Sequence, residues 1–196
     1  MNLGFFLSCL LLLAFRIEGE VMKNPVFEDW VTIKDESTGV EAEFPHVPLE
    51  MDVDTPFQNS SLEGHIHLYS LPMQKGLLVL CNFQSFIHLE NISKEGVKRF
   101  FEDILIPHFF FDPAVFLEEQ TFDFDGNEKQ ASFIFSFKDH QEIKKLEGKI
   151  FKKDNLLYIP FYLSSEKDFD SKLLRRFLNS IHLSGPSTSR KLLSGG

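Results

Sequence analysis

Apolar and polar residues alternate in many short segments of this chain. In residues 40–44 (VEAEF) three apolar residues alternate with two glutamates, and residues 49–54 (LEMDVD) repeat the pattern. Alternation with a period of two is typical of a β-strand that has one covered face. Residues 64–71 (GHIHLYSL) also alternate, so Ile66 and Leu68 are expected on one face of a strand and the two histidines on the other.

Longer alternating segments predict two β-hairpins in the second half of the chain. Residues 118–137 contain a turn at 125–127 (DGN), and residues 146–163 contain a turn at 154–155 (DN). Residues 77–83 (LLVLCNF) are apolar without alternation, which is typical of a central strand that is covered on both faces.

Two segments carry the periodicity of a helix. The first begins at Ser93, a good N-cap, and ends at Pro107. Its apolar stripe consists of Val97, Phe100, Phe101, Ile104 and Leu105. The second follows Ser164 or Ser165 as its N-cap, with an inward face formed by Phe169, Leu173 and Phe177. Residues 180–183 (SIHL) are expected to add a short final strand.

The order of these elements predicts the fold class. Antiparallel strands, a helix, further antiparallel strands and a closing helix indicate an α+β protein, in which an antiparallel sheet is covered by helices. Residues 28–183 form this domain, after a linker at 20–27 and before a flexible tail at 184–196.

The first part of the chain has the pattern of a targeting segment. Residues 3–15 are almost wholly apolar, which is too short for a membrane span of about 20 residues and suits the core of a signal peptide. Residues 1–19 are therefore interpreted as a signal peptide or an N-terminal anchor. Cys9 lies in a poor lipobox, so a lipoprotein is a lesser alternative. The expected location is periplasmic, extracellular or membrane-associated.

Charge and cysteine content narrow the possible partners. The net charge is −9, with 29 acidic against 20 basic residues, and an acidic chain repels nucleic acid. The interior is rich in phenylalanine, with 23 Phe. Cleavage after residue 19 would remove Cys9 and leave Cys81 as a single, buried thiol. No intrachain disulfide could then form.

Several of these segments resemble PsbP-like domains. The resemblance begins with Trp30 and the Phe44-Pro45 pair, followed by Pro48, and continues through residues 64–71 and the later hairpins up to about residue 183. It implies an α/β/α sandwich, a fold also seen in Ran-release factors and bacterial exported domains. It further implies a non-enzymatic accessory or binding domain, without implying a role in photosystem II.

His65 and His67 are the smallest arrangement that could begin a metal site. A zinc site needs further ligands on a neighbouring element, and His88, His108 and Glu63 are candidates by residue type only. Strand alternation explains the pair without a metal. We therefore expect both histidines to face water and assign no metal ligand.

Residues for catalysis do not form a known pattern. The sequence has no G-x-S-x-G motif and no glycine-rich phosphate loop, and Cys81 lies in a buried strand. The adjacent pair Glu118 and Glu119 is more typical of a solvated surface. We assign no catalytic or cofactor-binding residue and expect no cofactor and no enzyme activity. Asn59 and Asn91 match glycosylation acceptors, which would matter only in a eukaryotic source.

Three functions remain open at this stage. The first is an exported accessory domain that binds a protein through a sheet edge or a loop. The second is a binder of a small apolar ligand or lipid, suggested by the Phe-rich residues 109–116. The third is a metal-dependent enzyme built on residues 64–69. A filled core favours the first, a deep Phe-lined pocket the second, and ligands converging near His65 the third.

Overall fold

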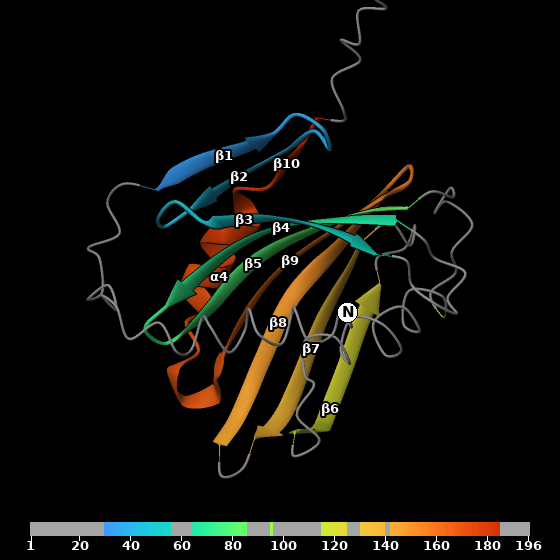
Figure 1. Ribbon diagram of the computed structural model, residues 1–196. Helices are drawn as coiled ribbons and strands as arrows, with labels where there is room; N and C mark the ends of the chain where they lie inside the picture. The colour runs from blue at the N-terminus through green and yellow to red at the C-terminus, as the bar shows by residue number, and fades with distance from the viewer. Residues whose placement is uncertain are drawn as a thin grey trace, which may run out of the picture.

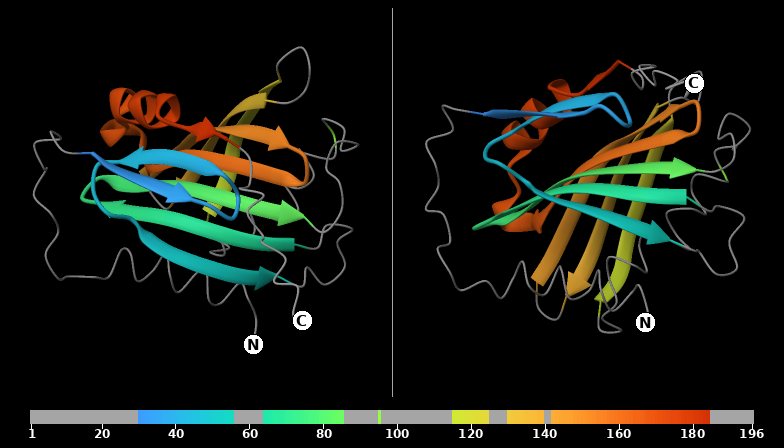
Figure 2. Two further views of the ribbon diagram at one scale, coloured as in Figure 1. Left: turned by 90° about the horizontal axis from the view of Figure 1, so that it is seen from above. Right: turned by 45° about the horizontal axis from the view of Figure 1, so that its top comes forward.

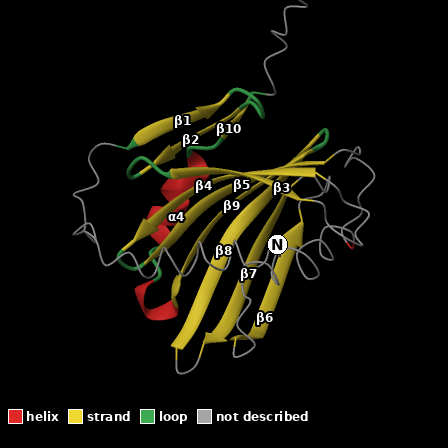
Figure 3. Cartoon of the chain, in the orientation of Figure 1, coloured by secondary structure: helices red, strands yellow, loops and turns green. Residues whose placement is uncertain are grey.

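Strands dominate the described part of the protein. The computed structural model describes residues 30–55, 64–85, 115–124, 130–139 and 142–184, together with residue 95. Within these residues every strand pairs antiparallel with its neighbours, and the strands form two sheets (Figures 1 and 3).

The larger sheet has seven strands in the order β3-β4-β5-β9-β8-β7-β6 (Figure 1). Its strands are β3 (Leu49–Thr55), β4 (Gly64–Met73), β5 (Gly76–Ser85), β6 (Val115–Phe124), β7 (Gln130–Asp139), β8 (Glu142–Lys153) and β9 (Leu156–Ser165). The β6–β7 and β8–β9 pairs confirm the two hairpins predicted from alternation. Residues 77–83 of β5 are buried throughout between β4 and β9, as the apolar run predicted.

The smaller sheet has three strands in the order β1-β2-β10 and lies over one face of the larger sheet (Figure 2). Its strands are β1 (Val31–Asp35), β2 (Val40–Phe44) and β10 (His182–Leu183). The 3₁₀ helix η3 (Glu166–Asp168) and the α-helix α4 (Ser171–Asn179) lead from the larger sheet back to the smaller one. The two ends of the described chain therefore meet in one small sheet.

Side chains from both sheets and from α4 fill the space between them. We call this cluster the inter-sheet core. Its apolar residues alternate along β2, β4, β5 and β9, and they meet the buried side of α4. The members are Val40, Ala42, Phe44, Tyr69, Leu71, Leu78, Leu80, Leu156, Tyr158, Tyr162, Leu173, Leu174 and Phe177.

The opposite face of the larger sheet carries a second cluster, the far-face core. Its aromatic members include Phe133, Phe135 and Phe137 at alternate positions of β7, with neighbouring ring centroids 5.5 Å and 6.2 Å apart. Cys81 belongs to this cluster and is fully buried, and burial raises the pKa of its thiol to about 12. This confirms that Cys81 is an apolar core residue and not a reactive thiol.

The N-cap of α4 differs from the sequence prediction. Ser164 and Ser165 are the last residues of β9, and the side chain of Asp170 caps the helix. Its Oδ1 accepts hydrogen bonds from the backbone N–H groups of Lys172 and Leu173, both at 3.0 Å. Strand pairing extends β9 as far as Ser165 and η3 follows it, so α4 begins later, with Asp170 as its N-cap.

The elements that cover the larger sheet also differ from the prediction. The antiparallel sheet is confirmed, but within the described residues one of its faces is covered by the smaller sheet together with α4, and not by helices alone. The helix predicted between Ser93 and Pro107 falls outside the described residues, apart from residue 95. An α/β/α arrangement with helices on both faces therefore remains a prediction.

Candidate binding site

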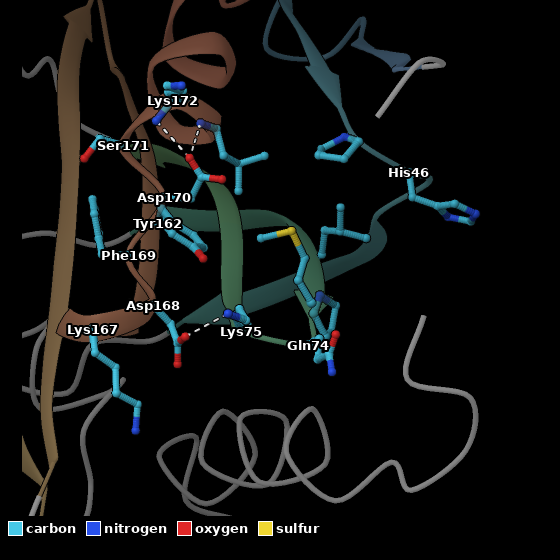
Figure 4. A pocket seen from close by; sticks show the side chains of 15 residues that line it. His46, Gln74, Lys75, Tyr162, Lys167, Asp168, Phe169, Asp170, Ser171 and Lys172 are labelled. Atoms are coloured by element: carbon cyan, nitrogen blue, oxygen red, sulfur yellow. Dashed lines mark hydrogen bonds and ion pairs between the residues drawn. The ribbon is translucent and has the colours of Figure 1, made fainter. Parts of the chain in front are cut away.

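A cavity of about 630 Å³ lies where three segments of the chain meet (Figure 4). One is the connection from β2 to β3, the second is the tip of the β4–β5 hairpin, and the third runs from η3 into α4. Tyr162 of β9 completes the lining. Because the three segments come from distant parts of the sequence, the cavity exists only after the two sheets and α4 have packed together.

The apolar part of the lining is continuous with the inter-sheet core. Leu71, Tyr162 and Leu173 are buried members of that core, while Met73 and Phe169 pack against it and are only partly buried. The ring centroids of Tyr162 and Phe169 are 5.1 Å apart. The cavity thus exposes an apolar floor that rigid strands and a helix hold in place.

Gly76 makes room for Tyr162 in this floor. A Cβ atom at Gly76 would lie 2.7 Å from the Tyr162 ring and 2.9 Å from the Cβ of Ser164, both closer than carbon atoms normally approach. Residue 76 must therefore lack a side chain for the ring to lie against the β5 backbone.

The rim of the cavity is charged. Lys75 at the hairpin tip forms an ion pair with Asp168 of η3, with 3.0 Å between Nζ and Oδ1, as Figure 4 shows. Ser165 Oγ donates a second hydrogen bond to Asp168 at 3.0 Å. The hydrogen bond from Lys75 and then that from Ser165 hold the pKa of Asp168 below its usual value. These contacts tie the hairpin tip to η3 across the cavity.

Two more charged residues of the lining, Lys167 and Asp170, are also held in place. Lys167 pairs with Glu142 at 2.8 Å, and this hydrogen bond raises the pKa of Lys167. Asp170 caps α4, as described above. Since Asp168 and Asp170 are both committed to structural contacts, neither lining carboxylate is placed as a free acid or base. The arrangement therefore suits binding better than acid–base chemistry.

A buried polar cluster lies under the turn between β1 and β2. Asp35 is 6% exposed, and its carboxylate accepts hydrogen bonds from Ser37, from Thr38 and from the Nδ2 of Asn82. Asn82 is 1% exposed, and its Oδ1 has no hydrogen-bond partner among the described residues. Tyr158 donates to the carbonyl oxygen of Thr38. These contacts join the smaller sheet to the larger one, so the cluster is structural.

His65 and His67 occupy the face that alternation predicted, but that face is not uniformly exposed to water. Ile66 and Leu68 point into the far-face core, and Tyr69 is buried in the inter-sheet core. His65 is exposed, whereas only 17% of the His67 side chain is exposed. The prediction that both histidines face water is therefore wrong for His67, because the smaller sheet covers this face.

Acidic residues of β3 flank the His67 ring. Its Nδ1 contacts Asp52 Oδ1, and its Nε2 lies 3.1 Å from Glu50 Oε1 without the alignment of a hydrogen bond. The two carboxylates approach the ring from opposite nitrogens and do not converge on one point. Within the described ranges no group of three or more His, Cys, Asp or Glu side chains could hold a metal ion.

Other residues considered in the sequence lie outside the described part of the chain. These are Glu63, His88, His108, Asn59, Asn91 and residues 109–114. Val115 and Phe116 begin β6, and the pairing of β6 with β7 shifts register between Leu117 and Glu119.

Sequence reasoning missed the charged residues of the cavity. Lys75 lies in a turn and Asp168 in a short 3₁₀ helix, where no periodicity marks them. Phe169, which was predicted on the inward face of the last helix, lies just before α4 and packs against the inter-sheet core. The one local signal was the turn at residues 72–76 (PMQKG), which precedes the apolar run of β5 and marks a loop at this position.

Comparison with known proteins found similarity at the level of structure. No family model matches the sequence, and the search of curated proteins found no match. The solution structure of cyanobacterial PsbP (CyanoP) from Synechocystis sp. PCC 6803 is similar in fold, at 12% sequence identity and with a TM-score of 0.47. The similarity covers 83% of this chain and 96% of that chain. At this identity and TM-score, no conclusion about family or function rests on the similarity.

None of the helices in the described residues has the length and apolar character that crossing a bilayer requires.

Proposed function

We propose that this chain is an exported, non-enzymatic accessory domain that binds another protein through the cavity between the β4–β5 hairpin and α4. The observation that carries the proposal is the composition of the cavity. A partly exposed apolar floor, including Met73 and Phe169, lies inside a rim of lysines and aspartates. Apolar anchors surrounded by polar contacts are typical of protein-binding surfaces.

A protein partner fits the cavity better than a small apolar ligand. Pockets for small apolar ligands are lined mainly by apolar side chains and enclose most of the ligand. Here eight of the 15 lining residues are polar or charged, namely His46, Gln74, Lys75, Lys167, Asp168, Asp170, Ser171 and Lys172. One anchoring side chain of a partner, with polar groups beside it, would match this lining.

Export remains part of the proposal. The apolar residues 3–15 have the length of a signal-peptide core. Mass spectrometry of the protein from its natural source would identify the mature N-terminus. A chain that still begins at Met1 in the cytoplasm would contradict export and leave the binding proposal unaffected.

The binding proposal is tested by changing the floor of the cavity. Met73→Glu places a charge among apolar side chains of a partly buried site and should weaken the binding of a partner by about tenfold or more. Ser132→Glu adds the same charge at an exposed position of β7 and is the matched control. Proteins captured from the natural source by the mature domain are identified by mass spectrometry for each variant.

A partner retained by the wild type and by Ser132→Glu but lost by Met73→Glu would support the proposal. Equal capture by all three would contradict it. Loss of a bound lipid or other small apolar molecule from Met73→Glu, without any change in captured proteins, would favour the apolar-ligand function instead.

A further inference from the structure

Basic side chains gather on the exposed side of α4. Lys172, Arg175 and Arg176 are all exposed and occupy positions i, i+3 and i+4, which lie on one face of a helix. The opposite side of α4 is buried in the inter-sheet core through Leu173, Leu174 and Phe177. The apolar side thus fixes the direction in which the cations point.

The three cations line a hollow of about 520 Å³ between the helix and the end of the smaller sheet. Its other lining residues are Glu43, Asn179, Ser180 and His182. Asn179, Ser180 and His182 add hydrogen-bonding groups. The lining therefore has an excess of positive charge, with Glu43 as its one carboxylate.

Arg176 is held at one side of this hollow. Its guanidinium lies over the Trp30 ring, 4.1 Å from the ring centroid, and 3.9 Å from a carboxylate oxygen of Glu43. Lys172 and Arg175, in contrast, have no ion pair with an acidic residue in the part of the chain that the structure describes. These two cations are available to an external anion.

Lys172 connects this hollow with the cavity described above, because it lines both. From Lys172 to Asn179 the helix rises by about 10 Å, a distance that about three residues of an extended chain can span. A polypeptide whose anchor occupies the cavity could therefore pass Lys172 and continue along α4.

We propose that the partner of this domain carries an acidic segment next to its apolar anchor, and that this segment binds along Lys172, Arg175 and Arg176. The inference rests on the proposed function of the cavity. The whole chain is acidic, with a net charge of −9, and repels acidic partners at long range. Recognition of an acidic segment therefore depends on this local group of cations. Their fixed positions along α4 favour one alignment of the acidic segment over others.

A membrane surface is a poorer occupant of the hollow. Helices that bind bilayers place apolar side chains beside their cations. The exposed large hydrophobic residues of the described part are Val47, Leu49 and Ile143, and all three lie outside α4. The lining of the hollow also includes Glu43, whose carboxylate would repel a flat layer of anionic headgroups. A polypeptide can avoid this repulsion by placing a neutral residue next to Glu43.

The test uses a fluorescent peptide in which one phenylalanine is followed by a run of glutamates, titrated with the mature domain at low salt. Lys172→Glu/Arg175→Glu should weaken its binding about tenfold or more, because two attractive charges become repulsive. Lys138→Glu/Lys149→Glu makes the same change of charge on the larger sheet and should alter binding less than about twofold. Circular dichroism checks that both double variants are folded.

Further arms separate the inference from the proposed function. A peptide with serines in place of the glutamates should bind more weakly than the acidic peptide. If it binds equally well and Met73→Glu abolishes binding, the cavity stands and the acidic-segment inference is overturned. If the double variant on α4 loses the acidic peptide and Met73→Glu does not, the basic hollow stands and the proposed function fails.

Two other anions are tested in the same way. Phosphatidylglycerol vesicles that bind the wild type and release the α4 double variant, while the acidic peptide binds neither, would overturn the inference in favour of a membrane. Displacement of the peptide by equal concentrations of inorganic phosphate would show a simple anion site and overturn it as well.

Discussion

The hydroxyl group of Tyr158 on β9 donates a 2.6 Å hydrogen bond to the backbone carbonyl oxygen of Thr38, in the turn between β1 and β2. The two residues are 120 positions apart, and both are buried. Burial, followed by the charges of Asp35 and Asp154, raises the pKa of Tyr158 to about 12, so the hydroxyl keeps its proton at neutral pH. This bond holds the smaller sheet against the larger one.

Replacing Tyr158 with phenylalanine should therefore destabilise the fold. The carbonyl oxygen of Thr38 would remain buried without its donor, which costs about 1–3 kcal/mol. Tyr69→Phe is the matched control, because Tyr69 is buried in the same core and its hydroxyl makes no hydrogen bond with another described residue. Urea unfolding of both variants measures the difference. Equal midpoints for the two variants would show that the Tyr158 bond contributes nothing.

The Asp35 carboxylate should make stability depend on pH in the acid range. Burial alone would raise the pKa of Asp35, but hydrogen bonds from Ser37 and Thr38 outweigh burial and lower it below the ordinary value of 3.8. A carboxyl group whose pKa is lower in the folded state stabilises the fold above its unfolded pKa. This contribution is lost as the pH falls from about 4 through the folded-state pKa.

Asp35→Asn removes this effect. The variant should lose about 1–3 kcal/mol of unfolding free energy at neutral pH. The Asp35 carboxylate accepts hydrogen bonds from Ser37, Thr38 and Asn82, and the NH₂ group of an asparagine cannot accept them. The difference from wild type should shrink as the pH falls below about 4. Glu36→Gln, at the exposed neighbouring position, should show neither change. A difference that stays constant down to about pH 2.5 would mean that the Asp35 charge does not stabilise the fold.

The side chains of β4 illustrate what the sequence could and could not predict. Alternation correctly placed Ile66 and Leu68 on one face and His65 and His67 on the other. It could not show what covers a face. The pattern of Val40, Ala42 and Phe44 is the same as that of a strand in the larger sheet, so nothing local indicated that these residues form a separate sheet.

The difference in the N-cap of α4 arises because several residues could act as the cap. Residues 164–170 (SSEKDFD) offer several possible N-caps, and the serines came first in the sequence. Pairing of Ser164 and Ser165 with β5 and β8 keeps both in β9, and this long-range interaction is invisible in the sequence. The cavity was missed for a similar reason, because its residues come together only through the packing of distant elements.

Gly148 of β8 should be intolerant of any side chain. Its neighbours across the sheet are Phe133 on β7 and Phe161 on β9, and both rings belong to the far-face core. A Cβ atom at Gly148 would lie 2.7 Å from the Cβ of Phe161 and 2.8 Å from the Phe133 ring, and it would also meet the carbonyl oxygen of Pro160. The missing side chain therefore makes room for two phenylalanines.

Gly148→Ala should cost about 1–3 kcal/mol of unfolding free energy, because overpacking forces neighbouring side chains or the backbone to shift. Denaturant unfolding measures this value. Lys149→Ala, at the next position and on the other face of the strand, should change stability by less than about 0.5 kcal/mol. An alanine variant as stable as wild type would show that the three strands can separate at this point without cost.

The histidines of β4 should not form a tight zinc site. A structural zinc ion needs about four ligands that point to one centre. Asp52 and Glu50 approach opposite nitrogens of the His67 ring, so a metal ion at either nitrogen would meet one of these carboxylates and not the other. His65 is exposed at the next position on the same face of the strand.

Calorimetric titration of the mature domain with zinc should therefore show only weak binding, unchanged in the His65→Ala/His67→Ala variant. Sub-micromolar binding of one zinc ion that disappears in the double variant would contradict this prediction and favour a metal-dependent function.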